Sequence, residues 1–588
     1  MQKGRFFMAL FALIFFTGLV GDIRADERSW SQRARSKKFA KSIASAPGKT
    51  LYIDESQADI SIIGTDRDEI SVEAMMEVRD SDDALVQKFL DQSELILEPY
   101  RLGFRMTLET PMSTRQEGRG EITRFLRRIL ESDDLDISVS VDIQIRLPSK
   151  QSLDVENKYG DVGIENVTGN LIVKNSSGVV TVESCGGELD VQNSYAAVDV
   201  IDFKGPVSVK NSSGEVSLNQ IEGEAEVENS YKKVWFRRIG GSLTVDSQSA
   251  IVVGDDVRGD CTIRSSYKEI DVAHIGGETE IKGNSCIVSV EDAQKSVVIE
   301  NSYKPVTVDS VGGSLKIRGQ SSMVTVYDVN EDVSIHTSYK EIRVENVAGP
   351  VTIHSQSSPV VVSDADRDVS VTTSYKTIHV DRVKGSLDVD GSSCSVFARD
   401  IGGDVTILSS YKDVVVERVG GLLNIRTGSG TVTANDIEKN VVVVSSYKPL
   451  QFKHIGGDLE VDGGSCSVTA EDVGGDVKIS NSYKYVVLKG TSGSIDVRGS
   501  SSPIEVADIK SLPEGSRIEL VTSYKPITLS LPKDTDAVVS AYTEYGKIRS
   551  DFPVLLNDRD EKTARIELGK ASTSVRLETS GNITIKKE

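Results

Sequence analysis

The sequence predicts an all-β protein, a single long β-solenoid (a parallel β-helix-like rod) of 18-residue coils grouped in 36-residue pairs. Three observations support this prediction. Tyrosine recurs ten times from Tyr159 to Tyr483 at intervals of 36 residues, without an insertion or a deletion. Aliphatic residues recur at half that interval, as Val306, Val324 and Ile342 do. Within a coil, apolar residues occupy every second position, which is the period of a strand with one buried face.

Each coil is expected to hold two strands and a turn, in the pattern V-x-V-x-x-V-G-G-x-L-x-V that begins at Val306. Gly312-Gly313 predicts a turn with positive φ between the two strands. One coil buries too little apolar surface to offset the entropy lost by ordering its residues, so only a stacked array is stable. A β-propeller is disfavoured because each blade needs about 40 residues. About 21 coils at ~4.8 Å each would make a rod about 100 Å long.

The chain begins with a predicted export signal, residues 1–25. Lys3 and Arg5 form a basic region, and residues 6–20 carry no charge. This uncharged run is short for a membrane span, which needs about 20 residues, so we expect no span after cleavage. An uncleaved anchor helix is the alternative. The mature protein is therefore expected in the periplasm, on the outer surface or outside the cell.

The remaining chain divides into three predicted parts: an N-terminal cap with a first coil (26–150), the repeat array (151–531) and a C-terminal cap (532–588). The N-terminal cap is expected to contain short helices at Asp82–Gln92 and Arg119–Glu131, and the second could instead lie on a membrane surface. Within the array, Ser511–Gly515 is expected to form a loop, because it absorbs five residues in excess of the period.

Charge and motifs exclude several classes of function. The formal net charge of -21 argues against nucleic acid as a partner, because phosphates require basic patches. No nucleophile-elbow, phosphate-loop, dinucleotide or zinc-protease motif is present, so we expect no cofactor and no catalytic residues. A polysaccharide-processing enzyme built on a β-helix remains the alternative. It would need a cluster of acidic and basic groups that breaks the repeat.

Residues 18 apart are expected to lie above one another, so each position of the coil becomes a column. One column alternates acidic residues with basic or polar residues, which predicts a ladder of surface ion pairs and hydrogen bonds. Calcium binding is the alternative for its carboxylates. The acidic members are Asp256, Asp292, Asp328, Asp364, Asp400, Asp436, Asp472 and Asp508, and between them stand Arg238, His274, Ser310, Asn346, Arg382, Arg418, His454 and Gly490.

The tyrosine column and the lysines that follow it form a candidate ligand-binding stripe. Tyrosines recur in every second coil, about 10 Å apart, with a small residue between them. Such a stripe could hold an extended polymer such as a polysaccharide by stacking and hydrogen bonding. Alternatively, each tyrosine covers a corner of the coil and each lysine offsets nearby carboxylates. The candidate residues are Tyr231, Tyr267, Tyr303, Tyr339, Tyr375, Tyr411, Tyr447, Tyr483, Lys268, Lys304, Lys340, Lys376, Lys412, Lys448 and Lys484.

The cysteines and histidines obey the same columns. Cys286, Cys394 and Cys466 share one position but lie several coils apart, too far to form a disulfide. With Cys185 and Cys261 at core positions, all five cysteines are expected to be small buried residues. His336 and His354 are 18 apart and should stack. A metal site shared by these two is disfavoured, because no third ligand is evident.

Both ends of the array resemble a known family. "VDIQIRLPSKQSLDVENKYGDVGIENVTGNLIVKNSSGVVTVES" (141–184), "LSLPKDTDAVVSAYTEYGKIRSDFP" (529–553) and "SVRLETSGNITI" (574–585) are similar to the bacterial adhesin-like β-solenoid family, also called toastrack domains. The resemblance implies an envelope or cell-surface role in adhesion, scaffolding or envelope-stress sensing, and it carries over no catalytic residues. Together with the missing motifs and the tyrosine column, it leads us to expect a non-enzymatic scaffold with polysaccharide or an envelope or surface protein as partner. A periplasmic structural or stress-sensing subunit is the second alternative to an adhesin-like scaffold.

Overall fold

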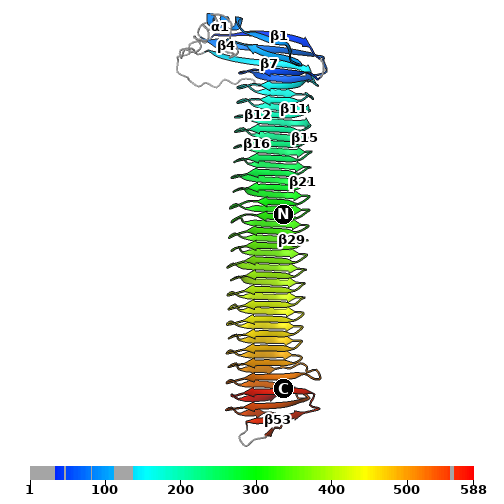
Figure 1. Ribbon diagram of the computed structural model, residues 1–588, viewed down its shortest axis with the longest axis vertical. Helices are drawn as coiled ribbons and strands as arrows, with labels where there is room; N and C mark the ends of the chain where they lie inside the picture. Colours follow the sequence, from blue (N-terminus) through cyan, green and yellow to red (C-terminus); the bar gives the residue numbers. More distant parts are fainter. Residues whose placement is uncertain (1–32, 46–47, 81–82, 112–136, 557–561) are drawn as a thin grey trace, which may run out of the picture.

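The described chain is a straight rod of about 20 turns, capped at its two ends (Figure 1). The structure is a computed structural model that describes residues 33–45, 48–80, 83–111, 137–556 and 562–588. The predicted β-solenoid is thereby confirmed. The expected signal peptide and the helix expected at Arg119–Glu131 lie outside the described residues. In the described ranges, no helix is long and apolar enough to cross a bilayer.

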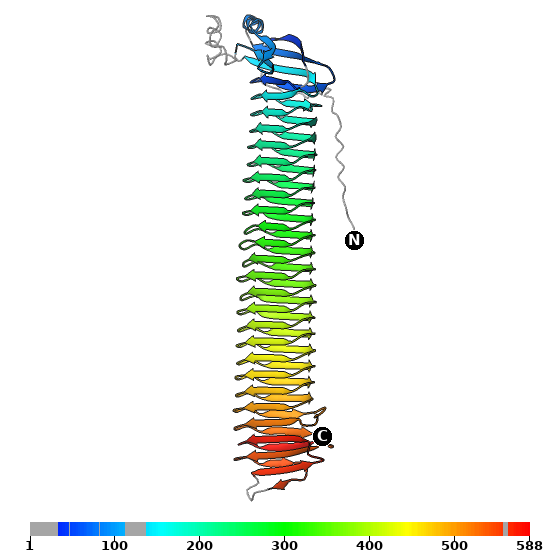
Figure 2. The ribbon, with the colours of Figure 1, turned by 45° about the vertical axis from the view of Figure 1, so that its right-hand side comes forward.

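Each turn contributes one strand to each of two sheets, which face each other across the core (Figure 2). Even-numbered strands from β8 (Ser152–Glu156) to β48 (Arg517–Thr522) form sheet B, and odd-numbered strands from β9 (Val162–Glu165) to β49 (Ile527–Leu531) form sheet A. Neighbouring strands in the array are parallel. Their paired residues are 18 apart from one coil to the next, except where β46 (Ile495–Gly499) pairs with β48 and β47 (Ile504–Ala507) with β49, at a separation of 23 residues. The five residue pairs between β25 (Val306–Val311) and β27 (Val324–Val329) illustrate the 18-residue register.

The core consists of the alternate side chains that the two sheets turn inward. In β25 and in β26 (Leu315–Arg318) these residues are Val306, Val308, Val311, Leu315 and Ile317, and each is at most 1% exposed. Val, Ile and Leu suit this position because β-branched and aliphatic side chains pack well on a pleated surface. Because every coil supplies the same set, one continuous core runs along the whole array.

From β9 to β47, each strand of sheet A bends near or directly after its end at one residue with left-handed backbone conformation. Ser310 has φ of 60° and Asp328 of 53°, and this position is skipped in the ladder: Asp309 pairs with Tyr327 and Val311 with Val329. Asp, Asn and His tolerate this conformation better than most residues other than glycine. The bend therefore explains why the predicted column of aspartates is rich in these residue types.

The positive φ expected at Gly312-Gly313 is wrong, because the left-handed residue lies two positions earlier. Glycine serves a different purpose at this turn. A Cβ atom added to Gly312 would lie 2.4 Å from the carbonyl oxygen of Gln294, and one added to Gly313 would lie 2.7 Å from the amide nitrogen of Ser296. The turn is therefore packed against the coil before it more closely than a side chain would allow here.

The left-handed bend predicts different effects on stability for two substitutions at Ser310. Ser310→Val should destabilise its coil by about 1–3 kcal/mol, because a β-branched side chain is strained at positive φ. Ser310→Gly should be tolerated, since Gly490 occupies the same column with φ of 65°. Hydrogen exchange of the amides in β25 would measure both effects. Equal protection in the two variants would contradict this account of the column.

The N-terminal end is closed by antiparallel strands that the repeat does not predict. β1 (Arg33–Ala44) pairs antiparallel with β4 (Glu69–Asp80), and β4 pairs antiparallel with β7 (Ser138–Pro148). The helix expected at Asp82–Gln92 is confirmed as α1 (Asp83–Asp91), which buries Val86 and Phe89 over the end of the core. The other strands here are β2 (Thr50–Asp54), β3 (Asp59–Thr65), β5 (Glu94–Tyr100) and β6 (Gly103–Glu109).

The C-terminal end is closed by strands that enter the interior of both sheets. β54 (Thr573–Thr579) lies between β48 and β50 (Ala537–Thr543), and β55 (Ile583–Lys587) lies between β49 and β51 (Ile548–Ser550). The loop expected at Ser511–Gly515 is confirmed between β47 (Ile504–Ala507) and β48. The outermost strands are β52 (Leu555–Leu556) and β53 (Thr563–Leu568), and short edge strands of this kind limit pairing between molecules.

Candidate functional site: the tyrosine corner

The predicted stripe lies on the corner that joins each strand of sheet B to the next strand of sheet A. We call this segment the tyrosine corner; in one coil it is Asn301–Pro305. All eight candidate tyrosines are on this corner and are 59–71% exposed, and the seven candidate lysines are exposed as well. More than half of each tyrosine side chain is therefore available to a ligand, and none of these rings is buried in the coil.

Two tyrosines show how their rings lie along the rod. The hydroxyl of Tyr339 donates a hydrogen bond to Oε1 of Gln356 at 2.8 Å, and that of Tyr303 reaches Oε1 of Gln320 at 3.5 Å. Both glutamines belong to the following coil, which carries serine in the tyrosine column. Each of these rings therefore extends across the coil that lacks a tyrosine, so the aromatic surface continues along the corner.

Successive coils present this corner in two alternating forms. In one form a tyrosine and a lysine are exposed, as Tyr303 and Lys304 are. In the other, the residue in the lysine column is small and buried, as Ser322 and Cys286 are, with no exposed surface. Because the 18-residue pairing register is constant from Tyr267 to Lys484, exposed and buried forms alternate over this part of the array. The tyrosines are thus separated by two coil spacings, about 10 Å.

Buried polar side chains hold the corner in place. Nδ2 of Asn301 donates to the carbonyl oxygens of Cys286 (2.7 Å) and Lys304 (3.4 Å), and its Oδ1 accepts from the amide of Cys286 at 3.1 Å. Thr337 uses its hydroxyl in the same way on Ser322. These hydrogen bonds satisfy backbone groups that have no partner in the strand ladder because the chain turns at the tyrosine corner. The sequence signal for this role is an Asn, Ser or Thr two residues before each tyrosine of the column, which the periodicity of the tyrosines alone does not explain.

The five cysteines are free and buried, as predicted. Burial raises the pKa of the Cys261 thiol to about 12 and that of Cys185 to about 11. At neutral pH these two groups therefore stay protonated, and a protonated thiol is a poor nucleophile. The cysteines act as small core residues.

A polar groove runs beside the tyrosine corner, on the side of sheet B. It is formed by three adjacent columns: the last outward residue of each strand, the buried corner residue and the corner serine, as in Lys210, Asn211 and Ser212. One stretch, from Glu156 to Gln248, encloses about 770 Å³. A second stretch of about 460 Å³ lies near the C-terminal end. Hydroxyl, amide and charged groups therefore line the surface next to the tyrosines of these two stretches, among them Tyr231 and Tyr483.

The C-terminal stretch of this groove contains one buried acidic residue. Glu519 is 5% exposed and forms ion pairs with Arg517 (2.5 Å), Arg576 (3.3 Å) and Arg498 (3.4 Å). The three arginines come from β46 (Ile495–Gly499), β48 and β54, so the cluster joins the array to the strands that close it. Its position at this junction indicates a structural role.

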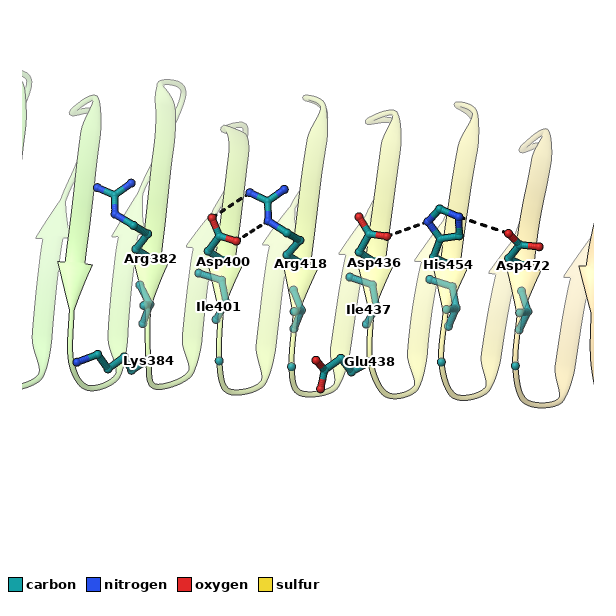
Figure 3. Close-up of a pocket in the computed structure, with 18 of the residues that line it drawn as sticks. Arg382, Lys384, Asp400, Ile401, Arg418, Asp436, Ile437, Glu438, His454 and Asp472 are labelled. Carbon is teal, nitrogen blue, oxygen red and sulfur yellow. Dashed lines mark hydrogen bonds and ion pairs between the residues drawn. The ribbon is translucent and has the colours of Figure 1, made fainter.

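A second groove, of about 1190 Å³, follows the left-handed bend on the opposite corner (Figure 3). The alternating column forms its charged wall, with buried residues such as Ile401 and Ile437 beneath. Arg418 pairs with Asp400 at 2.5 Å, and His454 lies between Asp436 (2.8 Å) and Asp472 (3.3 Å). These contacts confirm the predicted ladder.

Ion pairs offset part of the acidic charge of the ladder. Arg418 lowers the pKa of Asp400, and Arg382 lowers that of Asp364, in both cases through a hydrogen bond to the carboxylate. Within the described chain, no group of three or more His, Cys, Asp and Glu residues is arranged to hold a metal ion. His336 and His354 stack with ring centroids 6.3 Å apart and planes 20° from parallel, so their rings lie face to face.

Comparisons with known proteins add little to this geometry. No family model matches the chain, and no curated protein matches it either. Among solved structures, a chain from Clostridium sporogenes ATCC 15579, described provisionally as a cell adhesion protein, is 11% identical. The match covers 48% of this chain and 100% of that chain, with a TM-score of 0.13. A likeness at this TM-score carries no argument about fold or function.

Proposed function

We propose that this chain is an exported, non-enzymatic scaffold of the cell envelope or cell surface that binds an extended polysaccharide along its tyrosine corner. One observation carries the proposal: eight tyrosines, each 59–71% exposed, stand in one column at a constant spacing. Exposing aromatic rings to water is unfavourable, and the faces of such rings can stack on sugar rings. Near Tyr231 and Tyr483, the two stretches of polar groove offer hydroxyl and amide groups for hydrogen bonds to the sugars.

The repetition supports binding by many weak, equivalent contacts. From Tyr267 to Lys484 each pair of coils presents a tyrosine followed by a lysine, so a polymer that contacts one pair also reaches the next at high effective concentration. The affinity is then set by the number of coils engaged, and no single pocket is needed. This arrangement suits a scaffold that holds a long ligand without changing it. A decrease in the chain length of a bound glycan during incubation would contradict the non-enzymatic part of the proposal.

Replacing three neighbouring tyrosines by serine tests the site. Tyr303→Ser/Tyr339→Ser/Tyr375→Ser should weaken binding of the full chain to immobilised hyaluronan, chitin oligosaccharides or polygalacturonate by about tenfold or more, if that glycan is a ligand. The fold should tolerate the changes, because Ser321 and Ser357 already occupy this column. Surface plasmon resonance would measure the dissociation constants, and circular dichroism would confirm the β structure.

Tyr327→Ser is the matched control, since Tyr327 lies in the same coils but on the outer face of sheet A. It should leave glycan binding unchanged. If the triple variant binds as tightly as the natural chain, the tyrosine corner is not the binding site.

A further inference from the structure

We propose that the bound glycan is anionic and carries one carboxylate or sulfate for every two sugars. This inference rests on the proposed function and names the class of ligand that the tyrosine corner recognises. It is argued from the spacing of the corner, from the state of its lysines and from the charges that flank them.

The spacing favours a ligand with a two-sugar period. The exposed form of the corner recurs every second coil, about 10 Å, which is close to the length of one disaccharide in an extended β-linked glycan. Successive sugars in such a chain are turned over relative to each other, so the same face and the same substituent return every second sugar. A row of identical sites at this spacing therefore meets the same group of each disaccharide.

The lysines of the corner are free to bind an anion. Among the described residues, none of the seven candidate lysines has a carboxylate within ion-pair distance. Some other lysines in the array are paired across coils, as Lys384 is with Asp366 (2.7 Å) and Lys210 with Glu228 (2.8 Å), whereas others in the described chain, such as Lys295, have no ion pair. The seven candidate lysines differ from these others because they stand in one row, on a chain with a net charge of -21. From Tyr267 to Tyr483 the row supplies one cation for each tyrosine, and hence one for each disaccharide.

Flanking residues divide six of these seven lysines into two matched sets. Lys268, Lys340 and Lys412 are each followed by an acidic residue: Glu269, Glu341 and Asp413. Lys304, Lys376 and Lys448 are each followed by an uncharged residue: Pro305, Thr377 and Pro449. The second set should attract an anion more strongly, because a neighbouring carboxylate offsets part of the positive potential at each lysine of the first set. The two sets stand on the same corner in alternating coil pairs, so they differ mainly in this local charge.

The experiment compares four soluble probes on the full chain. Hyaluronan oligosaccharides carry one carboxylate for every two sugars, polygalacturonate oligosaccharides carry one on every sugar, chitin oligosaccharides are neutral, and oligo(dT) is an anionic polymer of another class. We expect hyaluronan oligosaccharides to bind most tightly, with an increment in affinity for each added disaccharide. Their binding should weaken as sodium chloride is raised, because salt screens exposed charges.

The two lysine sets give the decisive variants. Lys304→Gln/Lys376→Gln/Lys448→Gln should raise the dissociation constant for hyaluronan oligosaccharides by about tenfold. Lys268→Gln/Lys340→Gln/Lys412→Gln should raise it less. Each substitution lies on an exposed side chain and should leave the fold intact.

The other possible binding results each contradict a different part of the proposal. Chitin oligosaccharides binding as tightly as hyaluronan, without dependence on salt, would overturn the anionic ligand and leave the proposed function standing. Polygalacturonate binding at least as tightly would overturn the two-sugar period. Preference for oligo(dT) would overturn the glycan class. Absence of binding to all three glycans would overturn both this inference and the proposed function.

Discussion

The N-terminal end of the rod should lose stability as the pH rises from about 4.5 to 8, and replacing Glu55 by glutamine should abolish this loss. Glu55 follows β2, and burial raises the pKa of its carboxyl group from 4.5 to about 8. The amide of Leu108 donates to Oε1 at 2.5 Å and opposes this rise, whereas the charge of Asp54 adds to it. In the folded chain the group is therefore protonated over most of this pH range.

The direction of the effect follows from proton linkage. Between pH 4.5 and 8 the folded state holds a proton that the unfolded state has released, so stability falls by about 1.4 kcal/mol per pH unit. The total is on the order of 4 kcal/mol. Hydrogen exchange of the amides in β2, corrected for intrinsic rates, would measure it locally, because a long array does not unfold as one unit.

Glu55→Gln should be as protected at pH 8 as at pH 5, since glutamine carries no titrating proton and can still accept from Leu108. Glu98→Gln, on the exposed side of β5, is the control and should retain the pH dependence of the natural chain. An unchanged pH dependence in Glu55→Gln would contradict the assignment.

Replacing Asn301 by alanine should destabilise the tyrosine corner by about 3 kcal/mol or more. Asn301 is 2% exposed and makes three hydrogen bonds to backbone groups of Cys286 and Lys304. Alanine would leave those groups buried without a partner, and each such group costs about 1–3 kcal/mol. Exchange rates of the Cys286 and Lys304 amides and unfolding in urea would both report the change.

Two comparisons make the Asn301 result specific. Asn301→Thr should recover part of the loss, because Thr337 holds the equivalent corner with its hydroxyl. Asn424→Ala, on the exposed face of sheet B, should change stability by less than about 0.5 kcal/mol. If Asn301→Ala is as stable as Asn424→Ala, the buried hydrogen bonds do not determine the stability of the corner.

The repeated part of this fold was predictable from the sequence because its period is constant. Spacing alone predicted the 18-residue register, the buried cysteines and the charged ladder, and each is confirmed by the pairing of strands such as β25 and β27 or by the burial and contacts of these side chains. The left-handed bend was missed because its column of Asp, Asn and His was interpreted only as a row of charges. The expected positive φ was therefore placed at Gly312-Gly313, two residues too late.

The ends and the site were less predictable. The antiparallel pairing of β1 with β4 and the insertion of β54 between β48 and β50 do not repeat, so no periodicity announces them. At the tyrosine corner, spacing placed the tyrosines and lysines in columns. The polar groove and the hydrogen bonds from Asn301 involve side chains from several neighbouring columns. The spacing within one column does not show how neighbouring columns are placed around the corner.

The alternation of exposed and buried corners bears on how the length of this molecule can change. Gain or loss of 36 residues by recombination between repeats would add or remove one complete tyrosine and lysine, and the row would remain regular. Gain or loss of 18 residues would preserve the core but would place two tyrosines, or two small residues, in adjacent coils. Variants of different length should therefore differ by whole pairs of coils, with the reach of the rod changing by about 10 Å at each step.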